Sequence, residues 1–277
     1  MRPRHFVAVD WSGARLDGHR RTWLATARLP RAGRDRSVVT RLENGRTREQ
    51  VVEHLIELAS RDPRLVVGLD FAFSFPAWFL RARGLDDARA GWDCAAREGE
   101  TWLAHCPFPF WGRPGARRPR YDAERVAWRE TESETVRVRG ISPKTVFQVG
   151  GAGSVGTGSI RGMPSLAALS AAGFSIWPFD PPRLPLVVEI YPRDLTGPVN
   201  KSSRIARALR VQRDLAHESR TIQDLATASE DAFDAAISVA RMSRHARDFA
   251  RLEPARTPTE RLEGRIWRPR REPVFDR

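Results

Sequence analysis

Short apolar stretches recur along the first third of the chain, separated by polar segments of turn length. Residues 5–10, HFVAVD, have the pattern of a buried strand, and residues 21–29 and 37–43 alternate apolar and polar positions as half-buried strands do. Residues 47–61 carry apolar side chains at helical spacing, and a fully apolar strand follows at residues 65–70. This order predicts an α/β fold that opens with three strands, a helix and a returning strand.

The second half of the chain continues the alternation of helix and strand. Residues 163–172 predict a helix, and residues 174–179 and 186–192 predict strands. Two amphipathic helices are expected over residues 202–218 and 229–246. The chain therefore has enough strands for one sheet with helices on its faces.

Residues 76–143 differ in character, because they are rich in Trp, Arg, Pro and Gly. The segment 111–121, WGRPGARRPRY, is the clearest loop. We expect one domain over residues 1–277, with residues 76–143 as an insertion or elaborated region within it. From about residue 252 an Arg- and Pro-rich tail is expected to wrap loosely around the domain.

A basic balance favours polyanionic partners. The 277 residues include 47 Lys and Arg against 34 Asp and Glu, a formal net charge of +13. Only two of the basic residues are lysines, and such a skew is as typical of biased codon usage as of phosphate binding. Within residues 107–129, aromatic side chains suited to stacking on bases alternate with arginines suited to phosphates. The expected nucleic-acid contacts are Arg113, Arg117, Arg118 and Arg120, and the alternative is a solvated loop with a few buried tryptophans.

Several classes of protein are excluded by pattern. No apolar run approaches the length of a membrane helix, and the first residues lack the features of a signal peptide, which favours a cytoplasmic protein without a membrane partner. Cys94 and Cys106 form no zinc-binding pattern.

The stretch GAGSVG, residues 151–156, matches the glycine pattern of dinucleotide-binding loops. That function requires a preceding strand, which residues 144–149 could supply, and a helix that opens at the third glycine. Gly158, Gly162 and Pro164 disfavour such a helix, so we expect a turn-forming loop, no cofactor-binding residues and no dinucleotide cofactor.

The three most apolar strands each carry a single acid, namely Asp10, Asp70 and Glu189. Burial of an unpaired carboxylate is costly, and carboxyl ends of neighbouring parallel strands are where open α/β sheets place their sites. Asp234 borders the apolar stripe of the helix at 229–246, beyond the first turn that the Ser229 cap accounts for. A hard divalent cation would relieve the repulsion among such acids.

The ordered set VAVDWSG, VGLDFAFSFP, VVEIYP and EDAFDAAISVA resembles the family called domain of unknown function 429, regarded as predicted nucleases of the RNase H-like fold. The resemblance covers about residues 5–270. It implies a mixed sheet flanked by helices, with strand order 3-2-1-4-5 and the first strand beside the fourth.

The resemblance also implies catalysis by a metal-bound acid cluster holding one or two Mg²⁺ or Mn²⁺ ions. The catalytic residues it implies are Asp10, Asp70, Glu189 and Asp234, and the expected metal ligands are Asp10, Asp70, Asp234 and Asp231. A further glutamate from the first helix is found in RNases H. Glu49 and Glu53 are available for that role, but no pattern marks either of them.

The leading hypothesis is therefore a metal-dependent nuclease that hydrolyses phosphodiester bonds. One alternative is a nucleic-acid-binding module without catalysis. The other is an actin-like phosphotransferase or ATPase, because VDWSG is similar to a first phosphate loop, although that architecture usually pairs two such folds.

Overall fold

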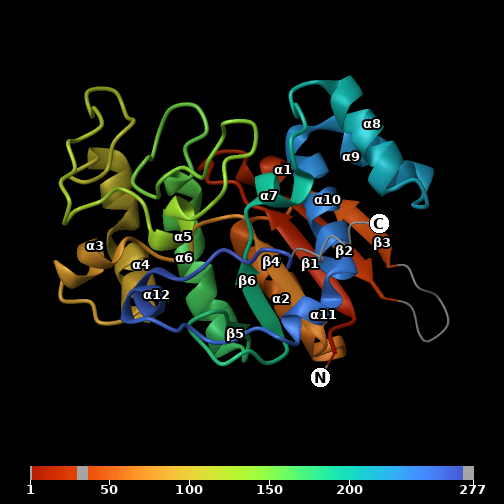
Figure 1. The fold of residues 1–277 in the computed structure, drawn as a ribbon, viewed down its shortest axis with the longest axis horizontal. Helices are drawn as coiled ribbons and strands as arrows, with labels where there is room; N and C mark the ends of the chain where they lie inside the picture. The colour runs from red at the N-terminus through yellow and green to blue at the C-terminus, as the bar shows by residue number, and fades with distance from the viewer. Residues whose placement is uncertain (1, 30–36, 271–277) are drawn as a thin grey trace, which may run out of the picture.

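Six strands form one mixed sheet in a computed structural model that describes residues 2–29 and 37–270 (Figure 1). The strands are β1 (His5–Asp10), β2 (Trp23–Arg28), β3 (Val38–Glu43), β4 (Leu65–Leu69), β5 (Ser175–Ile176) and β6 (Leu186–Glu189). β1 pairs with β2, and β2 with β3, in antiparallel fashion, whereas β1, β4, β6 and β5 are parallel to one another. The predicted α/β class with a mixed sheet is confirmed.

The strand order is β3-β2-β1-β4-β6-β5, so the predicted order 3-2-1-4-5 is wrong at its far end. The first strand does lie beside the fourth, but the next position belongs to the sixth strand. The short β5 lies outside it, because Ser175 and Ile176 pair with Leu186 and Val187 of β6.

Helices cover both faces of this sheet. They are α1 (Gly18–Arg21), α2 (Arg48–Arg61), α3 (Ala77–Arg81), α4 (Ala88–His105), α5 (Glu130–Ser133), α6 (Gly156–Ala171), α7 (Pro192–Thr196), α8 (Arg204–Asp214), α9 (Arg220–Ala228), α10 (Glu230–Arg244), α11 (Ala246–Phe249) and α12 (Pro258–Glu263). α10 packs across β1 and β2 on one face, while α2 and α6 cover the other and α4 lies against α6 (Figure 1). Successive side chains of β1 therefore point to opposite faces of the sheet. Phe6 and Ala8 pack toward α10, whereas Val7 and Val9 pack toward α6.

The helix predicted over residues 163–172 begins seven residues earlier, at Gly156. The expectation that no helix opens at the third glycine is therefore wrong. The glycines that argued against a helix serve close packing, since a Cβ on Gly156 would lie 2.2 Å from the Val146 carbonyl oxygen and one on Gly162 would lie 2.8 Å from the Phe71 ring. Pro164 is accommodated inside the helix. Residues 144–149, by contrast, form a turn rather than the strand that a dinucleotide site requires.

The region 76–143 supplies α3, α4 and α5, and its long helix α4 buries Trp92 and Trp102 in the same core as β1 and β4. The segment after residue 252 is more ordered than predicted. It forms α12 and then returns to the sheet, where the Trp267 backbone N–H donates to the Glu189 carbonyl oxygen at 2.8 Å. Within the described part of the chain, no helix is both long and apolar enough to cross a membrane.

The contact between the loop after β1 and the start of α6 can be tested at its two glycines. A Cβ on Gly13 would lie 2.4 Å from the Gly158 nitrogen, whereas a Cβ on Gly158 would meet its nearest atom, the Trp11 carbonyl oxygen, at 3.6 Å. We expect Gly13→Ala to lower the free energy of unfolding by about 1–3 kcal/mol, because backbone must shift. Gly158→Ala is the control and should be neutral or stabilising, because alanine favours the helical conformation over glycine by about 1 kcal/mol. Equal effects of both changes in urea unfolding would contradict this packing.

Candidate functional site

Three predicted acids meet at one edge of the sheet because their strands are parallel neighbours. Asp10 ends β1, Asp70 directly follows β4, and Glu189 ends β6. The Asp70 backbone N–H donates to the Val9 carbonyl oxygen at 3.0 Å, which continues the β1–β4 pairing to this edge. The sequence prediction that these carboxylates converge is thus consistent with the sheet register.

The helix α10 brings the fourth acid to the same edge. Ser229 caps α10 by accepting from the Ala232 backbone N–H, as predicted, and Asp234 follows one turn later with 5% of its surface exposed. The Asp234 Oδ2 accepts a hydrogen bond from the Lys201 ammonium, whereas its buried Oδ1 has no partner among the described residues. Asp231 lies in the first turn of α10, and burial raises its pKa.

The carboxylates are close enough to oppose one another's ionisation. Burial and then the charge of Asp234 raise the pKa of Asp70 to about 8. Burial and the charge of Asp70 raise the pKa of Asp10 well above its usual range. Burial raises the pKa of Asp234 to about 6, against the opposing effect of the Lys201 ammonium. The edge of the sheet is therefore short of positive charge.

Glu189 differs from the other acids because a buried arginine neutralises it. The Arg129 guanidinium, 1% exposed, donates to both oxygens of Glu189 at 2.9 and 2.5 Å and also to Glu132 at 2.9 Å. The Phe73 backbone N–H donates to Glu189 Oε2 at 2.9 Å as well. With both oxygens engaged, Glu189 has little capacity left for a metal or a water. The observed contacts of Glu189 are those of a buried ion pair, and its catalytic role stays a prediction.

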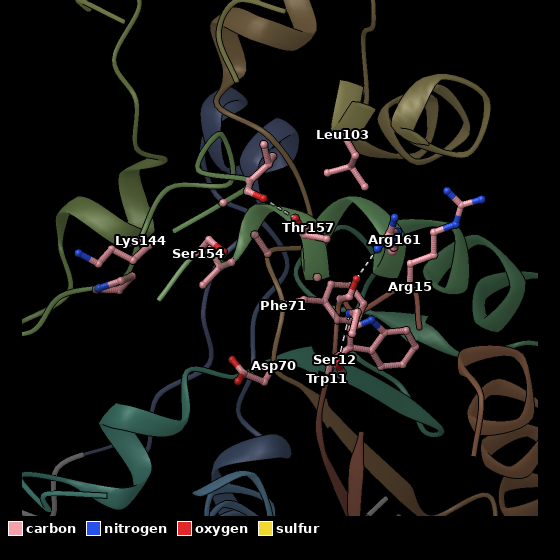
Figure 2. A pocket seen from close by; sticks show the side chains of 18 of the residues that line it. Trp11, Ser12, Arg15, Asp70, Phe71, Leu103, Lys144, Ser154, Thr157 and Arg161 are labelled. Atoms are coloured by element: carbon pink, nitrogen blue, oxygen red, sulfur yellow. Dashed lines mark hydrogen bonds between the residues drawn. The ribbon is translucent and has the colours of Figure 1, made fainter. Parts of the chain in front are cut away.

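A large cleft lies over this edge. It has a volume of about 1240 Å³ and reaches from Asp70 to the first turn of α6 (Figure 2). Tyr191 also lines it. Asp70 and Glu189 line it, whereas Asp10, Asp231 and Asp234 do not. The lining also includes the basic side chains of Arg15, Arg21, Arg113, Arg129, Lys144 and Arg161 and the acids Glu100 and Glu132. Arg161 forms an ion pair with Glu100. Those lining cations that form no ion pair within the described residues, Arg15, Arg21, Arg113 and Lys144, suit an anionic ligand.

The loop after β1 forms part of the wall and is held by two arginines. Arg161 of α6 donates to the Gly13 carbonyl oxygen at 2.5 Å, and Arg48 of α2 donates to the Ser12 and Ala14 carbonyl oxygens at 3.3 and 3.1 Å. Figure 2 shows Arg161 and Thr157 on α6 beside this loop. The glycine-rich stretch therefore borders the cleft, although it lacks the strand of a dinucleotide-binding loop.

The predicted nucleic-acid contacts lie on different parts of the inserted region. Arg113 lines the cleft, whereas Arg117, Arg118 and Arg120 are exposed on the loop that follows. The Arg118 guanidinium stacks on Trp128 at 4.9 Å from the ring centroid. Among the aromatic residues of this stretch, Phe110 is buried in the core and Phe108 is 52% exposed. The region thus combines core packing with an exposed basic loop.

The expected Mg²⁺ or Mn²⁺ fits part of the predicted ligand set. In residues 2–29 and 37–270, no group of three or more His, Cys, Asp or Glu side chains is arranged to hold a metal ion. The oxygen donors of Asp10 and Asp70 and the unpartnered Oδ1 of Asp234 suit a hard cation, but Lys201 occupies the other oxygen of Asp234. Glu49 and Glu53 line a separate groove of about 440 Å³ between α2, α4 and α6.

No family model, curated protein or solved structure matches this chain in comparisons with known proteins.

Sequence reasoning missed the two cations that complete the site, Arg129 and Lys201. Arg129 lies in the Trp- and Arg-rich region, where nothing distinguishes it from many other arginines. Lys201 did carry a signal, because it is one of only two lysines among 47 basic residues. Tyr191 was also missed, although it follows the apolar strand that delivers Glu189 and lines the cleft.

The buried ion pairs predict a large effect of Arg129 on stability. Arg129→Met leaves Glu132 and Glu189 buried without a cation, so we expect the free energy of unfolding to fall by about 3–5 kcal/mol. Adding Glu189→Gln to this variant should recover part of the loss, because one uncompensated charge is removed. Arg118→Met, at an exposed arginine, is the control and should change stability by less than about 1 kcal/mol. Chemical denaturation measures all three, and an Arg129→Met variant as stable as the control would contradict the role of the network.

Proposed function

We propose that this chain is a metal-dependent nuclease of RNase H-like fold, belonging to the domain of unknown function 429 family. The observation that carries the proposal is the placement of Asp10 and Asp70 at the carboxyl ends of the paired strands β1 and β4, with Asp234 on the helix packed against β1 and a basic cleft at Asp70. Burial and then neighbouring carboxylates raise the pKa of Asp10 and Asp70, so placing these acids together without a cation has no benefit for stability. Their arrangement is better explained by a ligand that they share.

In this proposal Asp10, Asp70 and Asp234 would hold one or two Mg²⁺ or Mn²⁺ ions, with Asp231 as a further ligand. When bound, the ions would activate a water and stabilise the leaving oxygen of a phosphodiester. Asp70 is the acid that both belongs to the cluster and lines the cleft, so it links the cation to the substrate. Glu189 acts indirectly, since its pairing with Arg129 fixes the end of β6 beside Asp70.

The cleft wall supports nucleic acid as the substrate. Arg15, Arg21, Arg113 and Lys144 line the cleft, and within the described residues none of them forms a salt bridge with an acid. Cations at such positions bind the phosphate backbone independently of base sequence. Arg117, Arg118 and Arg120 extend the basic surface beyond the cleft. The proposed substrate is accordingly a nucleic acid whose backbone crosses the cleft toward Asp70.

A second candidate is an actin-like phosphotransferase or ATPase. It is favoured by the N-terminus of α6, which begins at Gly156 and approaches the loop after β1 closely enough that a Cβ on Gly13 would collide with Gly158. Free backbone N–H groups at the start of a helix attract phosphate groups. A nucleic-acid-binding module without catalysis is a further alternative. It would use the same basic side chains of the cleft, but it would give Asp70 no role.

The proposal is tested by measuring cleavage and binding of the same nucleic acids. Single-stranded and duplex DNA, RNA, an RNA–DNA hybrid and a four-way junction are incubated with wild type and Asp70→Asn, with Mg²⁺, Mn²⁺ or a chelator. Wild type should cleave at least one of them only when metal is present, whereas Asp70→Asn should bind that substrate without cleaving it. Equal cleavage by both proteins, or ATP hydrolysis without nucleic-acid cleavage, would contradict the proposal.

Salt dependence identifies the binding surface in the same assay. Affinity should fall with added salt, and Arg113→Ala with Lys144→Ala should flatten the slope on duplex DNA by roughly 0.9 for each phosphate that the variant no longer neutralises. The triple change of Arg117, Arg118 and Arg120 to Ala removes charge from the neighbouring loop and shows whether that loop takes part. A slope that neither variant alters would place the nucleic acid elsewhere on the protein.

A further inference from the structure

Lys201 holds a position in the acid cluster that the nuclease chemistry does not require. Its ammonium forms an ion pair with Asp234, and its side chain is 18% exposed while that of Asp234 is 6% exposed. Its charge also acts on Asp10 and Asp70, where it opposes the effect of the neighbouring carboxylates on the pKa. A lysine ammonium thus lies where the three acids meet.

The backbone around Lys201 is built to hold this position. The buried Arg207 of α8 donates to the Lys201 carbonyl oxygen and to the Thr227 carbonyl oxygen, the latter at 3.1 Å. It also donates to the Ala228 carbonyl oxygen at 3.3 Å, immediately before the Ser229 cap of α10. One guanidinium therefore joins the turn that carries Lys201 to the start of the helix that carries Asp234. The ion pair is placed by the fold and is not a chance contact of a long surface side chain.

The ion pair satisfies only one of the two carboxylate oxygens of Asp234. One of its oxygens accepts from Lys201, and the other is buried with no hydrogen-bond partner in the described part of the chain. A buried carboxylate oxygen without a partner costs free energy, which a second ligand could recover. The predicted cation would use this oxygen, but the ammonium repels a divalent ion at such short range.

We propose that Lys201 is a built-in counter-ion of the acid cluster, which neutralises Asp234 in the metal-free protein and must leave it when a divalent cation binds. This inference rests on the proposed cation site at Asp10, Asp70 and Asp234. Lys201 is then a positioning residue that keeps the cluster folded without metal and lowers its affinity for metal. The flexible lysine side chain can move away while Arg207 holds its backbone in place.

Binding of Mn²⁺ alone, measured by calorimetry, separates this role from a merely structural one. Lys201→Gln should bind Mn²⁺ about tenfold more tightly than wild type, because the close charge pair no longer has to be broken. Lys144→Gln is the matched control, since it removes the other lysine of the chain, which lines the cleft, and reports the effect of net charge alone. Affinity of Lys201→Gln equal to or below that of the control would overturn the inference.

A second measurement leaves the protein unaltered and so does not depend on the folding of a variant. Lysine labelled with ¹³C at Cε gives two side-chain NMR signals, because the chain contains only Lys144 and Lys201. Titration with Mg²⁺ should shift the Lys201 signal toward that of a solvated lysine and leave the Lys144 signal in place. Saturation with Mg²⁺ without a change at Lys201 would overturn the proposal.

The outcomes distinguish this inference from the proposed function. If wild type binds Mn²⁺ and cleaves nucleic acid but Lys201→Gln binds no more tightly, only the counter-ion role fails. If neither protein binds Mn²⁺, both the cation site and the counter-ion role are wrong.

Discussion

Parallel strands β1, β4 and β6 end side by side, and each delivers one carboxylate to the same edge of the sheet, where α10 adds a fourth. Burial raises the pKa of Asp10, Asp70 and Asp234, and the charges of neighbouring carboxylates raise the pKa of Asp10 and Asp70 further. The register of the central strands fixes this proximity, and relaxing it would require the sheet to shift. The other parts of the site supply positive charge to these acids.

Segments outside the central sheet supply part of that charge. Arg129 comes from the region between β4 and β5 and pairs with Glu189, while Lys201 comes from the turn before α8 and pairs with Asp234. The two cations differ in kind, because Arg129 is enclosed by several hydrogen bonds whereas Lys201 has a flexible side chain with some exposure. Asp10 and Asp70 receive no ion pair within the described residues. Of these two acids Asp70 lines the cleft, which is where a functional cation would act.

The sequence predicted the parts of this arrangement that depend on short-range pattern. Apolar runs that each end in an acid located Asp10, Asp70 and Glu189, and a capped amphipathic helix located Asp234. The start of α6 could not be predicted, because Gly156 and Gly162 are explained by contacts with residues distant in the chain, the 146–148 turn and Phe71. The place of β5 and the partners of Glu189 and Asp234 also depend on tertiary contacts. The family resemblance and the nuclease chemistry remain predictions.

The pH dependence of stability tests the central claim, that Asp70 lies half-buried beside other acids without a cation. A pKa of about 8 in the folded protein lies above the usual value of 3.8, so the folded state binds a proton that the unfolded state releases between these values. Metal-free wild type should therefore lose stability as the pH rises from about 4 to 8. Asp70→Asn should lose less stability over this range. Addition of Mn²⁺ at pH 8 should stabilise wild type and leave Asp70→Asn unchanged. Thermal melts of both proteins across this range, with a chelator and with Mn²⁺, provide the measurement. Parallel pH profiles, together with indifference of wild type to Mn²⁺, would contradict the account.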